Sequence, residues 1–197
     1  MTEKIDITEI KAAHTRHPVA DFITARFSPR AFSEKNLSEE AMNTLFEAAS
    51  WAPSCFNEQP WEYYFALKNT EGFEKIWSCL MAGNQPWTTN AAALVVTVVR
   101  KTFTANGKPN ATAEHDLGLS NATLLLQARS MDIFGHAMAG FDKNKTAEAL
   151  NLDENRAAVC VIALGYLGDL EQLEEPFKSR EMTSRNRKPL DQFVHPV

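Results

Sequence analysis

The sequence predicts a mixed fold of helices and strands in which helices cover both faces of a central sheet. Two segments, residues 92–99 and 157–164, are almost continuously apolar, as expected for strands buried on both faces. Other segments place apolar residues at helical spacing, which is typical of helices that pack on a sheet. The 197 residues are 44% hydrophobic and 23% charged, so the chain has an ordinary globular composition, and we expect a single domain over residues 1–197.

Two helical regions are predicted in the first fifty residues. Residues 1–25 carry apolar positions at helical spacing on either side of Pro18, which indicates one or two short helices. The segment from Ser38 to Trp51 is the clearest helix, because Ser38 can cap it and the two glutamates that follow suit the positive end of the helix dipole. Its apolar face is formed by Met42, Leu45, Phe46 and Ala49.

The rest of the chain supplies the strands and their covering helices. Strands are predicted at Tyr63 to Leu67, Ala92 to Val99, Ile133 to Met138, and Ala157 to Leu164. Helices are predicted at Glu71 to Ala82, Ala113 to Met131, and from an Asp142 cap to Leu150. The second of these is apolar on more than one side, which predicts deep burial in the core or at a subunit interface.

Two segments are predicted to lack regular structure. Residues 102–111 are polar and contain Asn106-Gly107 and Pro109, which favours a loop or lid between a strand and the long helix. The tail from Arg185 has two prolines and few periodic apolar positions, and we expect it to be extended.

Composition and charge argue against several classes of protein. The sequence has no apolar run of roughly 18 residues, the length that a membrane span needs, and the mixed first ten residues predict neither a signal peptide nor an anchor. A net charge of -5 disfavours nucleic acid as a partner. The three cysteines are far apart, which predicts a reduced, cytoplasmic protein without a thiolate metal site.

Two basic segments are candidate anion sites in this acidic chain. Arg26-Phe27-Ser28-Pro29-Arg30 places two guanidinium groups and a hydroxyl together, and arginine forms forked hydrogen bonds that suit phosphate. Residues 184–188 add Arg185, Arg187 and a lysine in the tail. Taken alone, each segment is better explained as a solvated turn or a solvated tail.

Two further segments are candidate ligand loops. Residues 52–61 contain two prolines, which exclude a continuous helix, and the polar side chains of Ser54, Asn57 and Gln59. Residues 136–142 end a strand in small residues, which would let a flat ligand approach the backbone. Ordinary connections between elements explain both patterns about as well.

Together these segments resemble the nitroreductase family, in order over nearly the whole chain from about Asp21 to Val194. The resemblance lies in R-x-S-x-R at 26–30, P-S-x-x-N-x-Q-P-W at 53–61, G-F-D at 140–142, L-G-Y at 164–166 and R-x-R-K-P-L at 185–190. It implies an α+β fold whose mostly antiparallel sheet is sandwiched by helices. It also implies a homodimer that exchanges its C-terminal tails and binds FMN at the subunit interface.

The resemblance implies a role for each matching residue. Arg26, Ser28 and Arg30, with the backbone at Phe27, would hold the phosphate, ribityl chain and pyrimidine edge of FMN, and Arg185 and Arg187 would complete the phosphate clamp. The other subunit would contribute Pro53, Ser54, Cys55 and Asn57, while Met138, Ala139 and Gly140 would lie against the flavin ring. Cys55 and Ala139 depart from the serine and the acidic residue common in the family.

The activity implied is electron transfer from NADH or NADPH to a small organic acceptor, such as a nitroaromatic or a quinone, by a ping-pong mechanism. No side chain is needed as a nucleophile, so no catalytic residue is nominated. A flavin-binding protein with little turnover is one alternative, and a metal enzyme that uses His14 and His17 is another. His115 and Asp116 are candidate proton donors, although Asp116 also suits a helix N-terminus.

Overall fold

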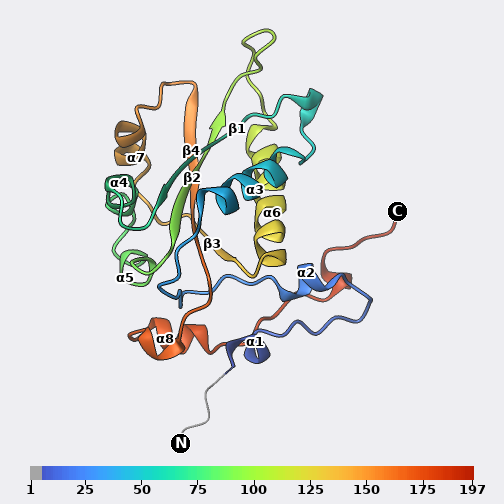
Figure 1. Cartoon of the computed structure of the whole chain (residues 1–197). Helices are drawn as coiled ribbons and strands as arrows, with labels where there is room; N and C mark the ends of the chain where they lie inside the picture. Colours follow the sequence, from blue (N-terminus) through green and yellow to red (C-terminus); the bar gives the residue numbers. More distant parts are fainter. Residues whose placement is uncertain (1–5) are drawn as a thin grey trace, which may run out of the picture.

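The centre of the structure is a four-stranded antiparallel sheet with strand order β1-β2-β4-β3 (Figure 1). The computed structural model describes residues 6–197, so the part of the N-terminal prediction on residues 1–5 lies outside the described residues. The strands are β1 (Trp61–Leu67), β2 (Ala93–Arg100), β3 (Phe134–Met138) and β4 (Arg156–Gly165). All four predicted strands are confirmed, with ends that differ by at most two residues.

Both faces of this sheet are buried, as its apolar strands predict. Along β2, the side chains of Leu94, Val96 and Val98 pack in one core cluster, and those of Ala93 and Val95 pack in another. This alternation follows from the two-residue period of a strand. Each face therefore needs a layer of helices.

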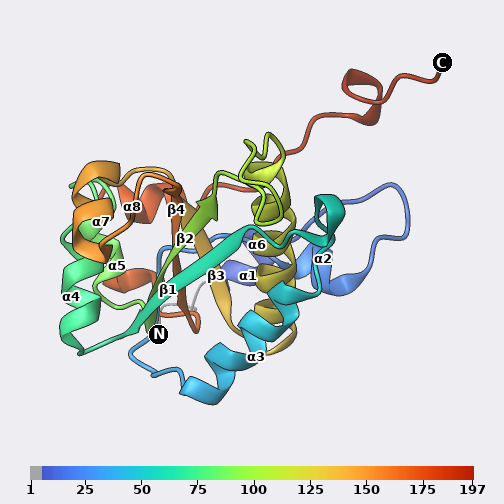
Figure 2. The same cartoon turned by 90° about the horizontal axis from the view of Figure 1, so that it is seen from above.

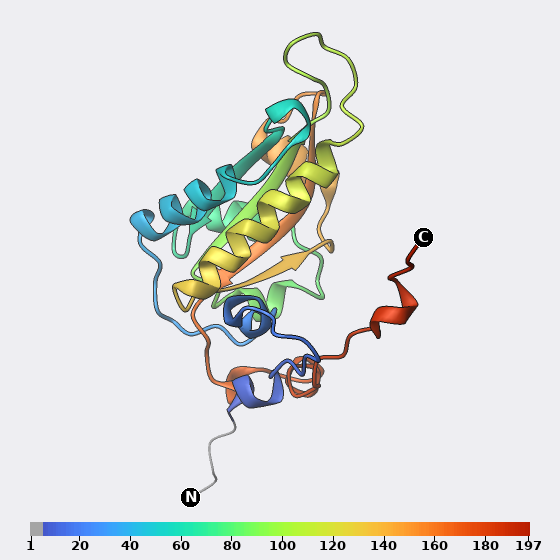
Figure 3. The ribbon, with the colours of Figure 1, turned by 90° about the vertical axis from the view of Figure 1, so that its right-hand side faces the viewer.

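The helices form a layer on each face, as Figures 2 and 3 show. One face is covered by α3 (Glu39–Ser50) and α6 (Ala113–Ser130), whose buried residues include Met42, Leu45 and Leu124. The other face is covered by α4 (Glu71–Trp77), α5 (Gln85–Thr88) and α7 (Lys143–Leu150). The predicted α+β class, with a mostly antiparallel sheet sandwiched by helices, is confirmed.

Two predicted helix caps are confirmed at the atomic level. Ser38 Oγ accepts the backbone N–H of Ala41 at 3.1 Å, and Asp142 Oδ1 accepts that of Lys145 at 2.9 Å. Each bond satisfies a backbone donor that the first turn of a helix leaves without a partner. The sequence therefore predicts these helix starts correctly.

The helix predicted at residues 71–82 is too long. It ends at Trp77, and the chain then pairs with a distant segment: Leu80 forms a bridge with Phe141, and Met81 N–H donates to Gly140 O at 3.0 Å. These tertiary hydrogen bonds replace the helical ones. The short helix α5 that follows was not predicted.

The remaining short elements lie mostly at one end of the sheet (Figure 1). They are α1 (Ile7–Ile10), α2 (Asp21–Ala25), α8 (Phe177–Glu181) and the 3-10 turns η1 (Cys55–Asn57), η2 (Leu170–Gln172) and η3 (Leu190–Gln192). The two short N-terminal helices confirm the prediction for that region. The tail beyond residue 183 runs away from the body as an extended segment interrupted by η3 (Figure 3). Of the helices described, none is long and apolar enough to cross a membrane.

Candidate functional site

Arginines from the two basic segments line one groove. Arg26 follows the end of α2, while Arg185 and Arg187 belong to the tail, and together with His14 they border a groove of about 450 Å³. The Arg185 guanidinium donates to the carbonyl oxygens of Thr24 and Arg26, each at 2.6 Å. The fold therefore brings together two segments that lie about 160 residues apart in the sequence.

Among the described residues, no acid compensates the positive charges in this groove. Within residues 6–197, Arg26, Arg185 and Arg187 form no ion pair with a carboxylate. Burial, and then the charge of Arg187, lower the pKa of Arg26 and also that of Arg185. The Nε atom of Arg185 is buried without a hydrogen-bond partner. Such a cluster favours a bound anion, which would relieve the repulsion and offer acceptors.

The residues between Arg26 and Arg30 face different surroundings. Arg26 donates to the exposed hydroxyl of Ser28 at 3.3 Å, so that hydroxyl lies beside the groove. The ring of Phe27 is 4% exposed and packs 4.9 Å from that of Phe134. Its side chain therefore belongs to the core, which leaves the Phe27 backbone as the part able to contact a ligand.

Arg30 lies in a cluster of its own. Its guanidinium carbon is 5.8 Å from the ring centre of Trp87, and its Nη1 atom is 3.7 Å from Glu181 Oε2. The backbone N–H of Arg30 donates to Glu181 Oε1 at 3.0 Å. Glu181, in α8, is 1% exposed, and burial raises the pKa of its carboxyl while the Arg30 N–H and the charge of Lys11 oppose that rise.

β3 runs beside this arginine segment. His136 Nδ1 lies 2.9 Å from Pro29 O, so Nδ1 carries the proton and donates it, because a carbonyl oxygen can only accept. The imidazole ring packs 4.6 Å from that of Trp87. The pKa of His136 is lowered to about 4, mainly by burial and also by the charges of Arg30 and Arg26, while the hydrogen bond to Pro29 opposes the shift.

The small residues after β3 have a structural reason for their size. Met138 is buried and Ala139 is exposed. A Cβ atom at Gly140 would lie 2.6 Å from Asn84 Nδ2, which donates to Gly140 O at 2.9 Å. A larger residue at position 140 would therefore displace the Asn84 amide and break this hydrogen bond.

The loop that contains Pro53, Ser54, Cys55 and Asn57 lies far from the arginines of its own chain. Cys55 N–H donates at 3.0 Å to Oδ2 of Asp116 in the first turn of α6. The last turn of α6 holds Arg129, which borders a second groove together with Phe27. Arg129 lies thirteen positions after Asp116, or roughly 20 Å along the helix at 1.5 Å per residue. One chain therefore places the two predicted parts of the site at opposite ends of α6.

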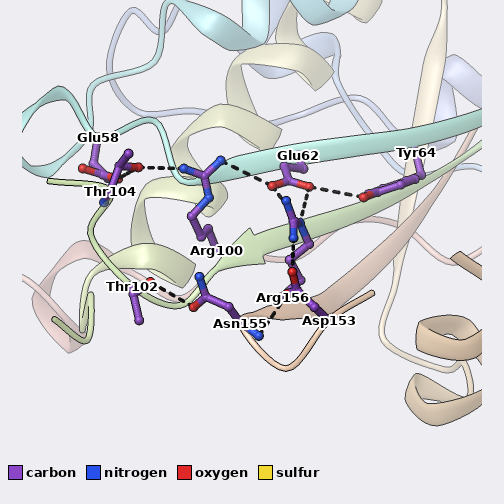
Figure 4. Close-up of polar contacts among 9 residues, drawn as sticks. All are labelled: Glu58, Glu62, Tyr64, Arg100, Thr102, Thr104, Asp153, Asn155 and Arg156. Atoms are coloured by element: carbon purple, nitrogen blue, oxygen red, sulfur yellow. Dashed lines mark hydrogen bonds and ion pairs between the residues drawn. The ribbon is translucent and has the colours of Figure 1, made fainter. Parts of the chain in front are cut away.

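A polar network ties this loop to the loop predicted at residues 102–111 (Figure 4). Glu58 Oε1 accepts the backbone N–H and the hydroxyl of Thr104 at 2.7 and 2.6 Å, and these bonds lower the pKa of Glu58. Arg100 donates to the same hydroxyl at 2.7 Å and pairs with Glu62 at 3.5 Å. Glu62 also accepts from Arg156 at 2.9 Å. The two loops are thus held together at one end of the sheet.

Comparison with known proteins identifies the family. Residues 23–166 match the model of the nitroreductase family. The chain belongs to the nitroreductase family. By class, the protein is therefore an oxidoreductase.

Solved and curated relatives agree with this family assignment. A solved oxidoreductase containing FMN is 31% identical, with a TM-score of 0.87 over 92% of this chain and 93% of that chain. An Archaeoglobus fulgidus protein that carries the provisional name NADH dehydrogenase/NAD(P)H nitroreductase is 27% identical over 78% of this chain and 87% of its own length. The structure of ydfN from Bacillus subtilis, at 21% identity, shares the fold with a TM-score of 0.71 over 89% of this chain and 97% of that chain.

In this nitroreductase-family chain, the structure describes the surroundings of Asp116 and of the pair His14 and His17. Asp116 is 2% exposed, and its oxygens accept from Cys55 and Thr112, so it anchors a loop. His14 and His17 lie between α1 and α2 in a non-helical segment, so the helical spacing assumed for a metal pair is wrong. In the part of the chain that the structure describes, no three His, Cys, Asp or Glu residues group to hold a metal.

Sequence reasoning missed three residues of the Arg30 cluster. These residues, Lys11, Trp87 and Glu181, come from distant parts of the nitroreductase-family chain, so no sequence pattern connects them with Arg30. A buried acid in a short polar helix has no local signal, because its burial comes from tertiary packing. Arg185 was predicted, but two of its donors hold the backbone of residues 24 and 26.

Proposed function

We propose that this chain is an FMN-dependent oxidoreductase that works as a homodimer. Bound FMN would supply the redox chemistry, taking electrons from NADH or NADPH and passing them to a small acceptor, such as a nitroaromatic or a quinone, in a ping-pong mechanism. The observation that carries the proposal is the groove in which Arg26, Arg185 and Arg187 meet with no carboxylate partner among residues 6–197.

The donors in this groove fit the phosphate end of FMN. Arg26 and Arg187 can offer forked hydrogen bonds to a phosphate, and Ser28 adds a hydroxyl beside them. Arg185 donates two hydrogen bonds to backbone carbonyl oxygens, so its role is to hold the Arg26 segment in place and to add positive charge. Arg30 lies farther along the same segment, where it would face the pyrimidine edge.

The remaining predicted contacts need a second copy of the chain. Pro53, Ser54, Cys55 and Asn57 lie at the other end of α6 from the arginines of their own chain, so a partner subunit would supply this loop. Met138, Ala139 and Gly140, at the end of β3, would lie against the ring from the arginine side. The site would then be formed at the subunit interface.

Exposed apolar residues support the homodimer. Phe22 and Ile23 of α2 are 48% and 46% exposed, and the tail exposes Leu190, Phe193 and Val194 by 52 to 57%. Large apolar side chains left exposed on a short helix and on a tail favour an interface that covers them. We infer that the tails are exchanged between the two subunits, where they would cover these residues. The free thiols of Cys55, Cys79 and Cys160 fit a cytoplasmic location.

The test is the absorbance spectrum of the purified protein, followed by anaerobic titration with NADH and then NADPH. We expect flavin bands, after addition of FMN if the protein is isolated without it, and we expect one or both nucleotides to bleach them. A subsequent quinone or nitroaromatic should restore the bands. A protein that neither carries nor takes up FMN would contradict the proposal.

The arginine assignment is tested by two substitutions. We expect Arg26→Ala and Arg187→Ala each to weaken FMN binding by roughly 1.5 to 3 kcal/mol, because each removes a charged hydrogen bond to phosphate. Arg180→Ala is the matched control, since Arg180 is exposed in α8 and its loss changes the net charge equally. Fluorescence titration with FMN gives the dissociation constants. Wild-type affinity for FMN in both groove variants would contradict the proposal that Arg26 and Arg187 bind its phosphate.

A further inference from the structure

Glu181 is a buried carboxylate, and only one of its oxygens has a hydrogen-bond partner among the described residues. Its side chain is 1% exposed, and within residues 6–197 the buried Oε2 atom has no such partner. The other oxygen, Oε1, accepts the backbone N–H of Arg30. A buried charge of this kind is costly unless opposite charges lie close by.

Two cations lie beside this carboxylate. The Arg30 guanidinium is 3.7 Å from Oε2, and the charge of Lys11 also favours the ionised carboxylate. Lys11 is 8% exposed, and its ammonium group donates to Thr183 O at 2.7 Å, next to α8. The cluster therefore holds two positive charges and one negative charge in a largely buried place.

We propose that Glu181 is a positioning residue that holds Arg30 and partly neutralises its charge, and that it thereby lowers the reduction potential of the flavin. This inference rests on the proposed function, in which Arg30 faces the pyrimidine edge of FMN. The Arg30 guanidinium lies near both the Trp87 ring and Glu181, so the carboxylate restricts where the guanidinium lies.

The direction of the effect follows from charge. Reduction brings negative charge to the pyrimidine edge of a flavin, and a nearby cation stabilises that charge. Glu181 opposes the stabilisation, because its own negative charge offsets that of Arg30 across 3.7 Å in a place with little water. Removing the charge of Glu181 should therefore make the flavin easier to reduce.

Glu181→Gln tests the inference with little change in shape. The amide oxygen of glutamine can still accept the Arg30 N–H, and what the amide nitrogen gives up is the weaker contact of the carboxylate with the Ala31 N–H. The midpoint potential of the FMN-loaded protein is measured by anaerobic spectroelectrochemistry in mildly alkaline buffer. We expect a shift to a more positive potential, whereas a purely structural role for Glu181 would leave the potential unchanged.

Two controls separate this effect from a general change of charge. Glu171→Gln removes the same charge from an exposed carboxylate that pairs with Lys178, and should leave the potential unchanged. In a protein that already carries Arg30→Met, adding Glu181→Gln should shift the potential much less than it does in the wild type. The reason is that a buried carboxyl that loses this partner tends to take up a proton, so little charge is left to remove. An equal shift with and without Arg30 would overturn the role assigned to Glu181.

A second variant keeps the proposal testable if Glu181→Gln does not fold. Glu181→Met removes the same charge, and a buried apolar side chain needs no opposite charge beside it. We expect the same shift to a more positive potential as for Glu181→Gln. An unchanged potential in either folded variant would overturn the inference while FMN binding remained. A wild-type protein that does not bind FMN would instead contradict the proposed function itself.

Discussion

His136 shows how a single buried side chain makes the stability of this protein depend on pH. Burial lowers its pKa from 6.5 to about 4. In the unfolded chain the imidazole therefore takes up a proton at a higher pH than in the folded one. As the pH falls from about 6.5 to about 4, the free energy of unfolding should decrease, by up to about 3 kcal/mol.

This residue-scale prediction is measured by urea unfolding across that pH range. His136→Asn is the comparison, because the asparagine amide can still donate to Pro29 O but does not titrate. The variant should lose a smaller part of its stability over the same range. Identical pH profiles for the two proteins would show that His136 does not cause the dependence.

At this scale the sequence predicts what depends on neighbours along the chain. The caps at Ser38 and Asp142 are correct, because each needs only a side chain and an N–H three residues away. The role of His136 beside Pro29, and that of Glu181 beside Arg30, depend on residues more than a hundred positions distant. Such contacts leave no pattern in a single sequence.

At the scale of the elements, the long helix α6 holds the loop that would reach the partner's site. Asp116 accepts the Cys55 N–H from within the first turn of this helix and is 2% exposed. Asp116→Ala leaves that donor without its acceptor, so we expect a loss of about 1.5 to 3 kcal/mol in the free energy of unfolding. Thermal and urea unfolding measure it.

A neighbouring residue supplies the control for this prediction. Glu114 is also an acid in the first turn of α6, but it is exposed. Glu114→Ala therefore reports the interaction with the helix dipole alone and should change stability much less. Equal losses in the two variants would mean that the hydrogen bond to Cys55 contributes little.

The elements themselves could be predicted wherever local pattern and tertiary packing agree. The apolar run of β2 is buried on both faces, and its prediction is correct within one residue at each end. The prediction for α4 fails at its C-terminus, because Leu80 and Met81 pair with the segment at 140–141. Helical spacing alone could not show that a competing partner lies nearby.

For the whole molecule, periodicity predicts two layers of helices around a sheet, but not the order or the direction of its strands. The order β1-β2-β4-β3 places β4 between β2 and β3, although β3 precedes β4 in the sequence. The family resemblance supplied the antiparallel arrangement, which the structure confirms. How the arginine groove and the 53–57 loop meet in one site depends on a second chain and remains a prediction.

The extended tail gives a test of that assembly. Truncation after Pro189 removes Leu190, Phe193 and Val194 and keeps Arg185 and Arg187 in the groove. Burying an apolar side chain contributes roughly 1.5 to 3 kcal/mol. If the partner subunit covers these three, their loss should weaken dimer formation at least about a hundredfold.

Sedimentation over a range of concentrations measures this loss of association. The double substitution Asp191→Ser and Gln192→Ser, at polar positions of the same tail, should leave association unchanged. Because the 53–57 loop would come from the partner, the truncated protein should also bind FMN more weakly at concentrations where it is monomeric. A truncated protein that stays dimeric, with wild-type affinity between its subunits, would contradict the exchange of tails. Retained FMN affinity in a monomer would mean that one chain alone forms the site.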